Sequence, residues 1–214
     1  SRAESRSSSS LTSSAVPLST SPIEEARGPL TPAPAKMWAI DPKLSGRTVQ
    51  ERIVLGSGVL DDHQLDGLLI TALDELAWIT NLRGDHFAYQ ATFRGRGLTT
   101  RSAVKLQADT STLQKDRAVE AAVELFALAP GGSGVDDVVQ GFGLAAGARV
   151  GVDPATVPYA LCLHLAKQGC VLVEVPSPFA LLRTKKTPQE LDHMAAAFKR
   201  ADGVVDEVQK WLAK

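Results

Sequence analysis

Charged residues that could carry out chemistry gather in one short stretch, "TALDELAWITNLRGD", residues 71–85. Four of them lie among apolar residues directly after the apolar run "DGLLIT": Asp74, Glu75, Arg83 and Asp85. Acids and a guanidinium placed just after a buried strand could form part of an active site. They could equally belong to a strand-to-helix turn, because acids at a helix start oppose the helix dipole favourably. In that interpretation Arg83 bonds the carbonyls at the end of the helix.

Two other kinds of active site lack their sequence patterns. The glycine-rich segments "GRG" and "PGGSG" match neither G-x-x-x-x-G-K-[ST] nor a strand–G-x-G-x-x-G–helix context, so they predict loops rather than phosphate cradles. The chain also lacks the G-x-S-x-G pattern of a serine nucleophile. Cys162 and Cys170 lie in apolar surroundings, where a thiol is buried and inert.

Acids and histidines cluster without the spacing of metal ligands. "DDH", "GDH", "CLH" and "ELDH" contain neither H-E-x-x-H nor paired C-x-x-C motifs. A dinuclear hydrolytic site needs several carboxylates and imidazoles that converge from rigid elements, whereas the four histidines lie on different segments. These residues therefore predict solvated or capping side chains and no metal site within this chain.

Composition limits the partners and the compartment. A formal net charge of −1 and a pI near 6.4 provide no general attraction to nucleic acid or to an anionic membrane. The basic run "RTKK", Arg183–Lys186, precedes a helix and predicts a solvated loop. No apolar run approaches the roughly 18 residues of a membrane span. Two cysteines make no disulfide framework, which favours a reducing, cytoplasmic location.

The chain divides into three parts by composition. Residues 1–43 are rich in serine and proline, which predicts a disordered or linker segment. Serine and arginine with few acids also resemble a transit peptide, so a mitochondrial or plastid location stays open. Residues 44–186 have the pattern of a globular domain, and residues 187–214 predict a long final helix.

Within the globular part, strands alternate with helices, which predicts an α/β domain. The strands are expected at 66–71, 103–108, 148–154 and 170–178, with 118–128 either a helix or a segment that runs into a strand. The helices are expected from Thr48, from residue 73 to near Gly84, at 134–142, at 156–169 and from Thr187. Thr48 with Glu51, and Thr187 with Glu190, have the spacing of a capping box. Gly56 and Gly58 weaken the first helix, so the pattern leaves its end open.

Four ordered stretches resemble the aminopeptidase P branch of the creatinase/prolidase, or "pita-bread", metallopeptidases. These are "LSGRTVQERI", "DGLLITALDELAWITNLRGD", "RVGVDPATVPYAL" and "EVPSPFALLRTKKTPQELDHMAAAFKRADGVVDEVQKWL". The resemblance spans Leu44 to Leu212 and implies the family's non-catalytic domain, a mixed β-sheet flanked by helices. One departure follows "NLRG", where the family usually has Asn-Pro and this chain has Gln90-Ala91.

The same resemblance implies a function for a longer parent protein. The family removes an N-terminal residue that precedes proline, using two divalent metal ions, commonly manganese, held by a catalytic domain beyond Lys214. This chain is then expected to supply scaffold, cleft wall and dimer contacts, with that catalytic domain as its partner in the same parent chain. Arg83, Asp85 and His86 are the residues expected to face the substrate cleft. The alternative is a peptidase-derived, non-enzymatic interaction module in a larger assembly.

Overall fold

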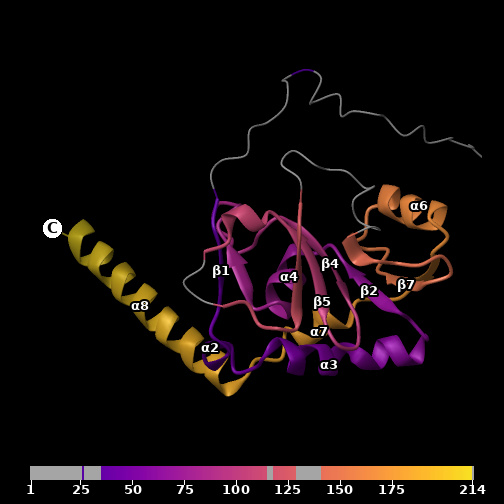
Figure 1. Cartoon of the computed structure of the whole chain (residues 1–214). Helices are drawn as coiled ribbons and strands as arrows, with labels where there is room; N and C mark the ends of the chain where they lie inside the picture. Colours follow the sequence, from indigo (N-terminus) through magenta and orange to yellow (C-terminus); the bar gives the residue numbers. More distant parts are fainter. Residues whose placement is uncertain (1–25, 27–34, 115–117, 129–140, 214) are drawn as a thin grey trace, which may run out of the picture. The chain divides into compact units, whose positions relative to one another are not determined.

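The computed structural model describes residues 26, 35–114, 118–128 and 141–213 (Figure 1). Most of the helix predicted at 134–142 and most of the linker predicted at 1–43 lie outside these residues, although residues 141–142 are described and helical.

Six of the described strands form one sheet in the order β6-β5-β4-β2-β7-β8. Their bounds are β2 Gly67–Ile70, β4 Gly95–Thr99, β5 Val104–Ala108, β6 Val123–Ala127, β7 Arg149–Val152 and β8 Val171–Glu174. The pairs β2–β4 and β4–β5 are antiparallel, whereas β5–β6, β2–β7 and β7–β8 are parallel. The predicted α/β fold with a mixed sheet is therefore confirmed.

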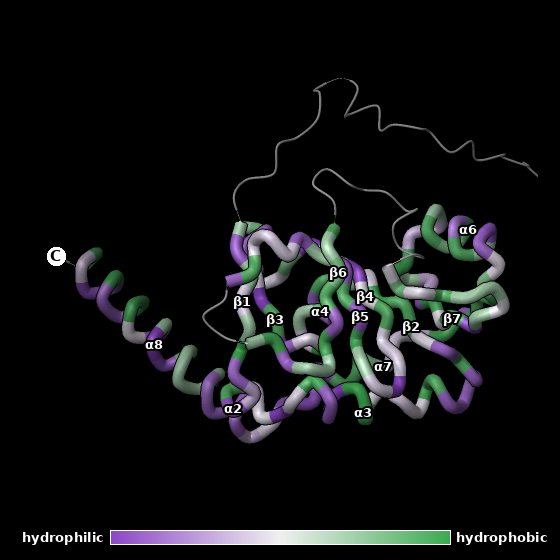
Figure 2. Tube along the Cα trace, viewed as in Figure 1, coloured by the Kyte–Doolittle hydropathy of each residue, from purple (hydrophilic) through white to green (hydrophobic). Residues whose placement is uncertain are grey.

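Strand β2 lies at the centre of this sheet and is buried along its whole length. Leu68 and Ile70 belong to a core on one face, whereas Leu69 belongs to a core on the other. Successive side chains of a strand point to opposite faces, so this continuous apolar run fills both cores. Figure 2 shows the corresponding hydrophobic colouring of the central strands.

Helices cover the two faces of the sheet. Helices α3 (Val49–Asp62), α4 (Leu73–Ile79) and α7 (Pro178–Leu182) contribute to the core that contains Leu68. Helix α6 (Tyr159–Lys167) contributes Leu161 and Leu165 to the opposite core. The layered arrangement follows from the apolar stripe of each helix, which must pack against the sheet to leave water.

Both predicted capping boxes are present. In α3 the Thr48 hydroxyl accepts a hydrogen bond from the Glu51 N–H at 3.2 Å, and Glu51 accepts one from the Thr48 N–H at 2.7 Å. Thr187 and Glu190 do the same at the start of α8, Pro188–Leu212. Two such reciprocal bonds satisfy backbone donors that a helix leaves free at its start.

The two helical glycines of α3 differ in their surroundings. A Cβ on Gly56 would lie 2.3 Å from a ring carbon of Phe179, whereas a Cβ on Gly58 would meet nothing within 4 Å. Gly56 thus allows α7 to approach α3 closely, and the helix continues through both glycines to Asp62. Helix propensity alone left this end open because it does not include the packing of Phe179.

The helix predicted from residue 73 to near Gly84 ends earlier than predicted. Helix α4 ends at Ile79, and Asn81 adopts a left-handed conformation with φ 54°. Its amide Nδ2 donates to Glu120 Oε1 at 2.7 Å and to the Arg47 carbonyl at 3.0 Å. These bonds hold a turn, after which the chain continues as a strand rather than as a helix.

That strand, β3 (Leu82–Gly84), pairs antiparallel with β1 (Met37–Ala39) in a second, two-stranded sheet. Strand β1 and the start of α2 (Pro42–Ser45) both lie within the predicted linker. The boundary expected at residue 43 is therefore too late, because a three-residue strand is too short to show an alternating pattern.

Other elements differ from the sequence expectation in smaller ways. Strand β4 and helix α7 were not predicted, and β6 shows that the ambiguous segment 118–128 ends in a strand. Cys170 is buried, as expected of an inert thiol, but it precedes β8. Strand β8 is a half-exposed edge strand rather than a buried one.

We predict opposite effects for two substitutions two residues apart in α3. Gly58→Ala should raise the free energy of unfolding by about 0.5–1 kcal/mol, because alanine favours a helix interior and Gly58 faces open space. Gly56→Ala should lower it by about 1–3 kcal/mol through the clash with Phe179. Urea denaturation followed by circular dichroism measures both. Equal shifts of the same sign would show that Gly56 has no packing role.

Candidate functional site

The two acids of the candidate stretch both lie in the first turn of α4, as the turn interpretation expects, but they differ in environment. Asp74 is about half exposed and forms an ion pair with Arg183, with 2.5 Å between Oδ2 and Nη2. Glu75 is only 4% exposed. An exposed ion pair contributes about 0–1 kcal/mol, so the buried carboxyl of Glu75 is the more consequential of the two.

Glu75 is held where β2, β7 and β8 end. The Ser177 hydroxyl donates to Glu75 Oε2 at 2.5 Å, and the Ser177 N–H donates to Asp153 Oδ2 at 2.9 Å. The Ser177 hydroxyl also accepts a hydrogen bond from the Phe179 N–H at 3.3 Å, which caps α7. These bonds make Glu75 a positioning residue for the start of α7. Burial raises the pKa of Glu75.

A pH-dependent stability difference follows from Glu75. Its folded-state pKa lies above the unfolded one, so its contribution is fully present below the unfolded pKa and is lost as pH rises through the folded pKa. Replacement by glutamine, Glu75→Gln, removes the titration but keeps an acceptor for Ser177. We expect the free energy of unfolding of the wild type, relative to Glu75→Gln, to fall as the pH is raised from about 4.

Urea denaturation at several pH values measures this difference. The control is Glu207→Gln, because Glu207 is exposed on α8. Its stability relative to the wild type should change far less with pH. A Glu75→Gln curve parallel to that of the wild type would contradict the assignment.

Arg83 bonds the end of α4, although from a strand rather than from the helix itself. Its Nη1 donates to the carbonyl of Ala77 in the last turn of α4 and, at 2.8 Å, to the carbonyl of Leu82. Burial lowers the pKa of the guanidinium. Arg83 therefore bonds a carbonyl at the end of the helix, as the turn interpretation expects.

Asp85 and His86 lie in different surroundings from Arg83. Asp85 Oδ1 accepts a hydrogen bond from the Lys36 N–H at 2.6 Å, and the Asp85 N–H donates to the Lys36 carbonyl at 3.2 Å. His86 is half-buried, and its Nδ1 lacks a hydrogen-bond partner among the described residues. Burial, followed by the nearby charge of Arg94, lowers the pKa of His86. The structure therefore gives each of the three expected cleft residues a separate environment.

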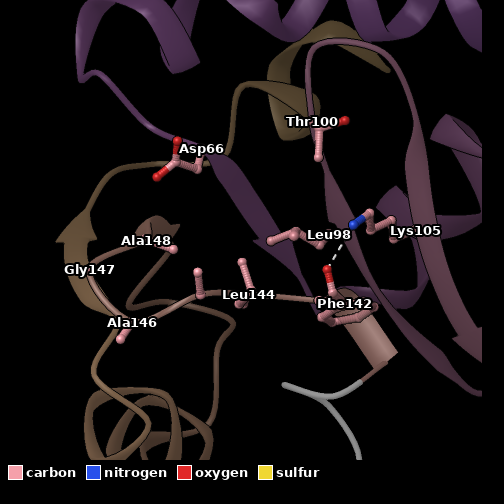
Figure 3. Close-up of a pocket in the computed structure, with 11 residues that line it drawn as sticks. Asp66, Leu98, Thr100, Lys105, Phe142, Leu144, Ala146, Gly147 and Ala148 are labelled. Carbon is pink, nitrogen blue, oxygen red and sulfur yellow. Dashed lines mark hydrogen bonds between the residues drawn. The ribbon is translucent and has the colours of Figure 1, made fainter.

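One pocket of about 460 Å³ lies beside the sheet, at residues that the sequence analysis did not single out (Figure 3). Its charged side chains are engaged with backbone. Lys105 Nζ donates to the Phe142 carbonyl at 2.8 Å, and Asp66 Oδ2 accepts from the Arg149 N–H at 2.8 Å. The remaining lining is mostly small, from Gly143 to Ala148. The two charged groups thus fix the walls of this pocket.

A second pocket, of about 400 Å³, contains Arg83. It lies among α2, β3, α4 and the first two turns of α8. Its lining combines apolar and charged side chains: Ile40, Leu44, Ser45, Trp78, Arg83, Lys186, Glu190, His193 and Met194. No local sequence pattern marks the residues of this pocket, because Trp78 and Glu190 are more than a hundred positions apart and share no motif.

No group of three or more His, Cys, Asp or Glu in the described part of the chain could hold a metal ion. The described residues therefore do not fit the two-metal centre that the resemblance implies. Nor does this part of the chain contain a helix long and apolar enough to cross a membrane.

A mixed six-stranded sheet with helices on both faces is the architecture of a layered α/β domain. The model for the Creatinase/Prolidase N-terminal domain matches residues 29–190. The chain belongs to this family, as the N-terminal type of domain found in aminopeptidase P and prolidase-like peptidases.

Similar sequences and structures agree with this membership. Aminopeptidase P1 of Arabidopsis thaliana is 26% identical over 199 residues, which cover 79% of this chain. A probable Xaa-Pro aminopeptidase P of Aspergillus clavatus is 30% identical over 178 residues, again 79% of this chain. The chain spans only 30% and 26% of the length of these relatives.

Solved structures show the same fold. The X-prolyl aminopeptidase of Caenorhabditis elegans, a cytosolic enzyme with a di-nuclear active site, superposes with a TM-score of 0.68 at 17% identity. The match covers 86% of this chain and 30% of that one. The Xaa-Pro dipeptidase of Bacillus anthracis gives a TM-score of 0.56 at 18% identity, over 77% of this chain and 44% of that one.

Proposed function

We propose that this chain is the non-catalytic domain of a longer Xaa-Pro aminopeptidase-like metallopeptidase. The observation that carries the proposal is helix α8. It extends from Pro188 to Leu212, beyond the end of the matched family domain at residue 190. None of its residues is buried, although many are apolar.

The apolar residues of α8 form one continuous stripe. Six of them lie three, four or, in one case, seven residues apart, a spacing that places side chains on one helix face: Leu191, Met194, Phe198, Val205, Val208 and Leu212. Each is between 40% and 70% exposed, and the alternation of green and purple along α8 in Figure 2 reflects this pattern. A continuous stripe of exposed apolar side chains marks an interaction surface. We therefore expect α8 to pack against a partner. We assign that partner to the catalytic domain of the same parent chain.

In the proposed parent, the reaction is the removal of an N-terminal residue that precedes proline. Two divalent metal ions, manganese in this proposal, would activate the attacking water in the catalytic domain. This domain would contribute scaffold, dimer contacts and a cleft wall that includes Arg83, Asp85 and His86. The parent is proposed to be cytoplasmic, like the similar nematode enzyme, or organellar if residues 1–43 act as a transit peptide.

The proposal predicts metal-dependent activity only in an extended protein. The product of the native reading frame continued past Lys214 should, with Mn²⁺, hydrolyse a peptide whose second residue is proline. Residues 1–214 alone should not, and a chelator should abolish the activity of the extended protein. Release of the first residue, quantified by chromatography, is the measurement. Hydrolysis by residues 1–214 alone would contradict the proposal.

A second prediction concerns the partner of α8. Phe198→Ala should change the free energy of unfolding of residues 1–214 by no more than about 0.5 kcal/mol, because Phe198 is 63% exposed there. In the extended protein the same change should cost about 3 kcal/mol, because the ring would be buried. Urea denaturation of both proteins measures the difference. Lys199→Ala, the adjacent exposed position, serves as the control and should have little effect in either.

The exposed face of α8 also fits a second candidate, a non-enzymatic interaction module whose partner is a separate chain. The departure from the family pattern at Gln90-Ala91 favours this candidate. A stop codon directly after Lys214 would support it and would exclude a catalytic domain in the same chain. In that case Phe198→Ala should weaken assembly with the other chain rather than intramolecular stability.

A further inference from the structure

The 400 Å³ pocket beside α8 combines an apolar wall with cationic groups at its edge. Trp78, Ile40, Leu44 and Met194 supply the apolar surface. Arg83 and Lys186 supply the positive charge. A pocket of this size, mostly apolar and with a few polar groups, is typical of small-ligand sites.

The pocket is built by a close approach of two helices that the chain fixes firmly. Gly46 ends α2 with φ 67°, and a Cβ there would lie 2.6 Å from Thr187 Oγ1. The Thr187 hydroxyl donates to the Ser45 carbonyl at 3.2 Å, which joins α2 to the first turn of α8. The walls contributed by Leu44 and Met194 are therefore held at a set separation.

Arg83 is a half-buried cation without a paired anion among the described residues. Its Nη1 bonds two backbone carbonyls, those of Ala77 and Leu82, and no carboxylate of the described residues lies within ion-pairing distance. Burial lowers the pKa of Arg83, and the nearby charge of Glu190 acts in the opposite direction. Burying a charge without a counter-ion is costly, so an anion in the pocket would relieve this cost.

The acid within the pocket does not meet this need. Glu190 acts on Arg83 electrostatically, but its Oε2 accepts the Thr187 N–H at 2.8 Å in the capping box of α8. Lys186, whose Nζ also donates to the Arg183 carbonyl at 2.5 Å, adds a second positive charge at the pocket. The lining thus offers two cations, one engaged carboxylate and the polar side chains of Ser45 and His193 beside an indole and three aliphatic or thioether side chains.

We propose that this pocket binds an amphipathic carboxylate, with its carboxylate on Arg83 and Lys186 and its apolar part against Trp78, Leu44 and Met194. Two sources share this chemistry, a free aryl- or alkyl-carboxylic acid and the C-terminal carboxylate of a peptide with an apolar last residue. The assignment concerns residues 1–214 alone and does not rest on the proposed peptidase function, so each can fail without the other.

Binding of 4-phenylbutyrate to residues 1–214 tests the proposal, with the indole N–H resonance of Trp78 in ¹⁵N-labelled protein as the signal. We expect saturable shifts of that resonance and binding at least about tenfold weaker for the neutral isostere 4-phenylbutyramide, because a charge-assisted bond to Arg83 is lost. Arg83→Gln should weaken binding of the acid by a similar factor. Equal affinities for the acid and the amide would overturn the proposal.

Two further variants keep the test decisive if Arg83→Gln does not fold. Leu44→Trp adds bulk at a 44%-exposed pocket residue and should abolish binding, and Lys186→Gln should weaken it. Arg200→Gln, an exposed cation farther along α8, is the control and should bind as the wild type does. Unchanged binding in both Leu44→Trp and Lys186→Gln would place the ligand elsewhere and overturn the assignment.

A peptide pair distinguishes the two sources. Ala-Ala-Phe with a free C-terminus is compared with its C-terminal amide under the same conditions. Tighter binding of the peptide acid than of 4-phenylbutyrate identifies a peptide C-terminus, whereas the reverse order identifies a small carboxylic acid. Either order supports the carboxylate site. Absence of saturable binding by both acids would reject it.

Discussion

The burial of β2 on both faces is the constraint on which the rest of the domain depends. Leu68 and Ile70 fill one core and Leu69 the other, so helices must cover both sides of the sheet. Because β2 runs parallel to its neighbour β7, the chain between these two strands must cross over the sheet before it returns. Helix α4 begins within three residues of β2, and its acids are thereby fixed at the end of the strand.

Buried polar groups then determine how the chain leaves α4. Arg52 is only 1% exposed, lies 4.8 Å from the centre of the Trp78 ring and donates to the Trp78 carbonyl. Burial lowers the pKa of Arg52 to about 10. Glu120 joins the turn at Asn81 to the start of α3, because its two oxygens accept from Asn81 Nδ2 and from the Val49 N–H at 2.8 Å. Unpaired, such groups would cost about 1–3 kcal/mol each, so these bonds fix one path for the chain.

The exposed apolar face of α8 is the observation that supports the proposed role of this domain. In that proposal this domain supplies a scaffold and a docking surface, and a partner domain supplies the catalytic groups. The pocket around Arg83 adds a binding capacity that this division of labour does not need.

The sequence by itself determined the elements whose signals are local. Both capping boxes, the apolar run of β2 and the ordered family motifs lie within short windows, so the α/β fold and the family follow from them. The tertiary structure alone decided the features that depend on distant residues. The end of α4 depends on Asn81 meeting Glu120, and the continuity of α3 depends on Gly56 meeting Phe179. The environment of Arg83 depends on α8, whose residues lie about a hundred positions away. Propensity and spacing describe neighbours along the chain, whereas burial and charge pairing arise only when folding brings distant segments together.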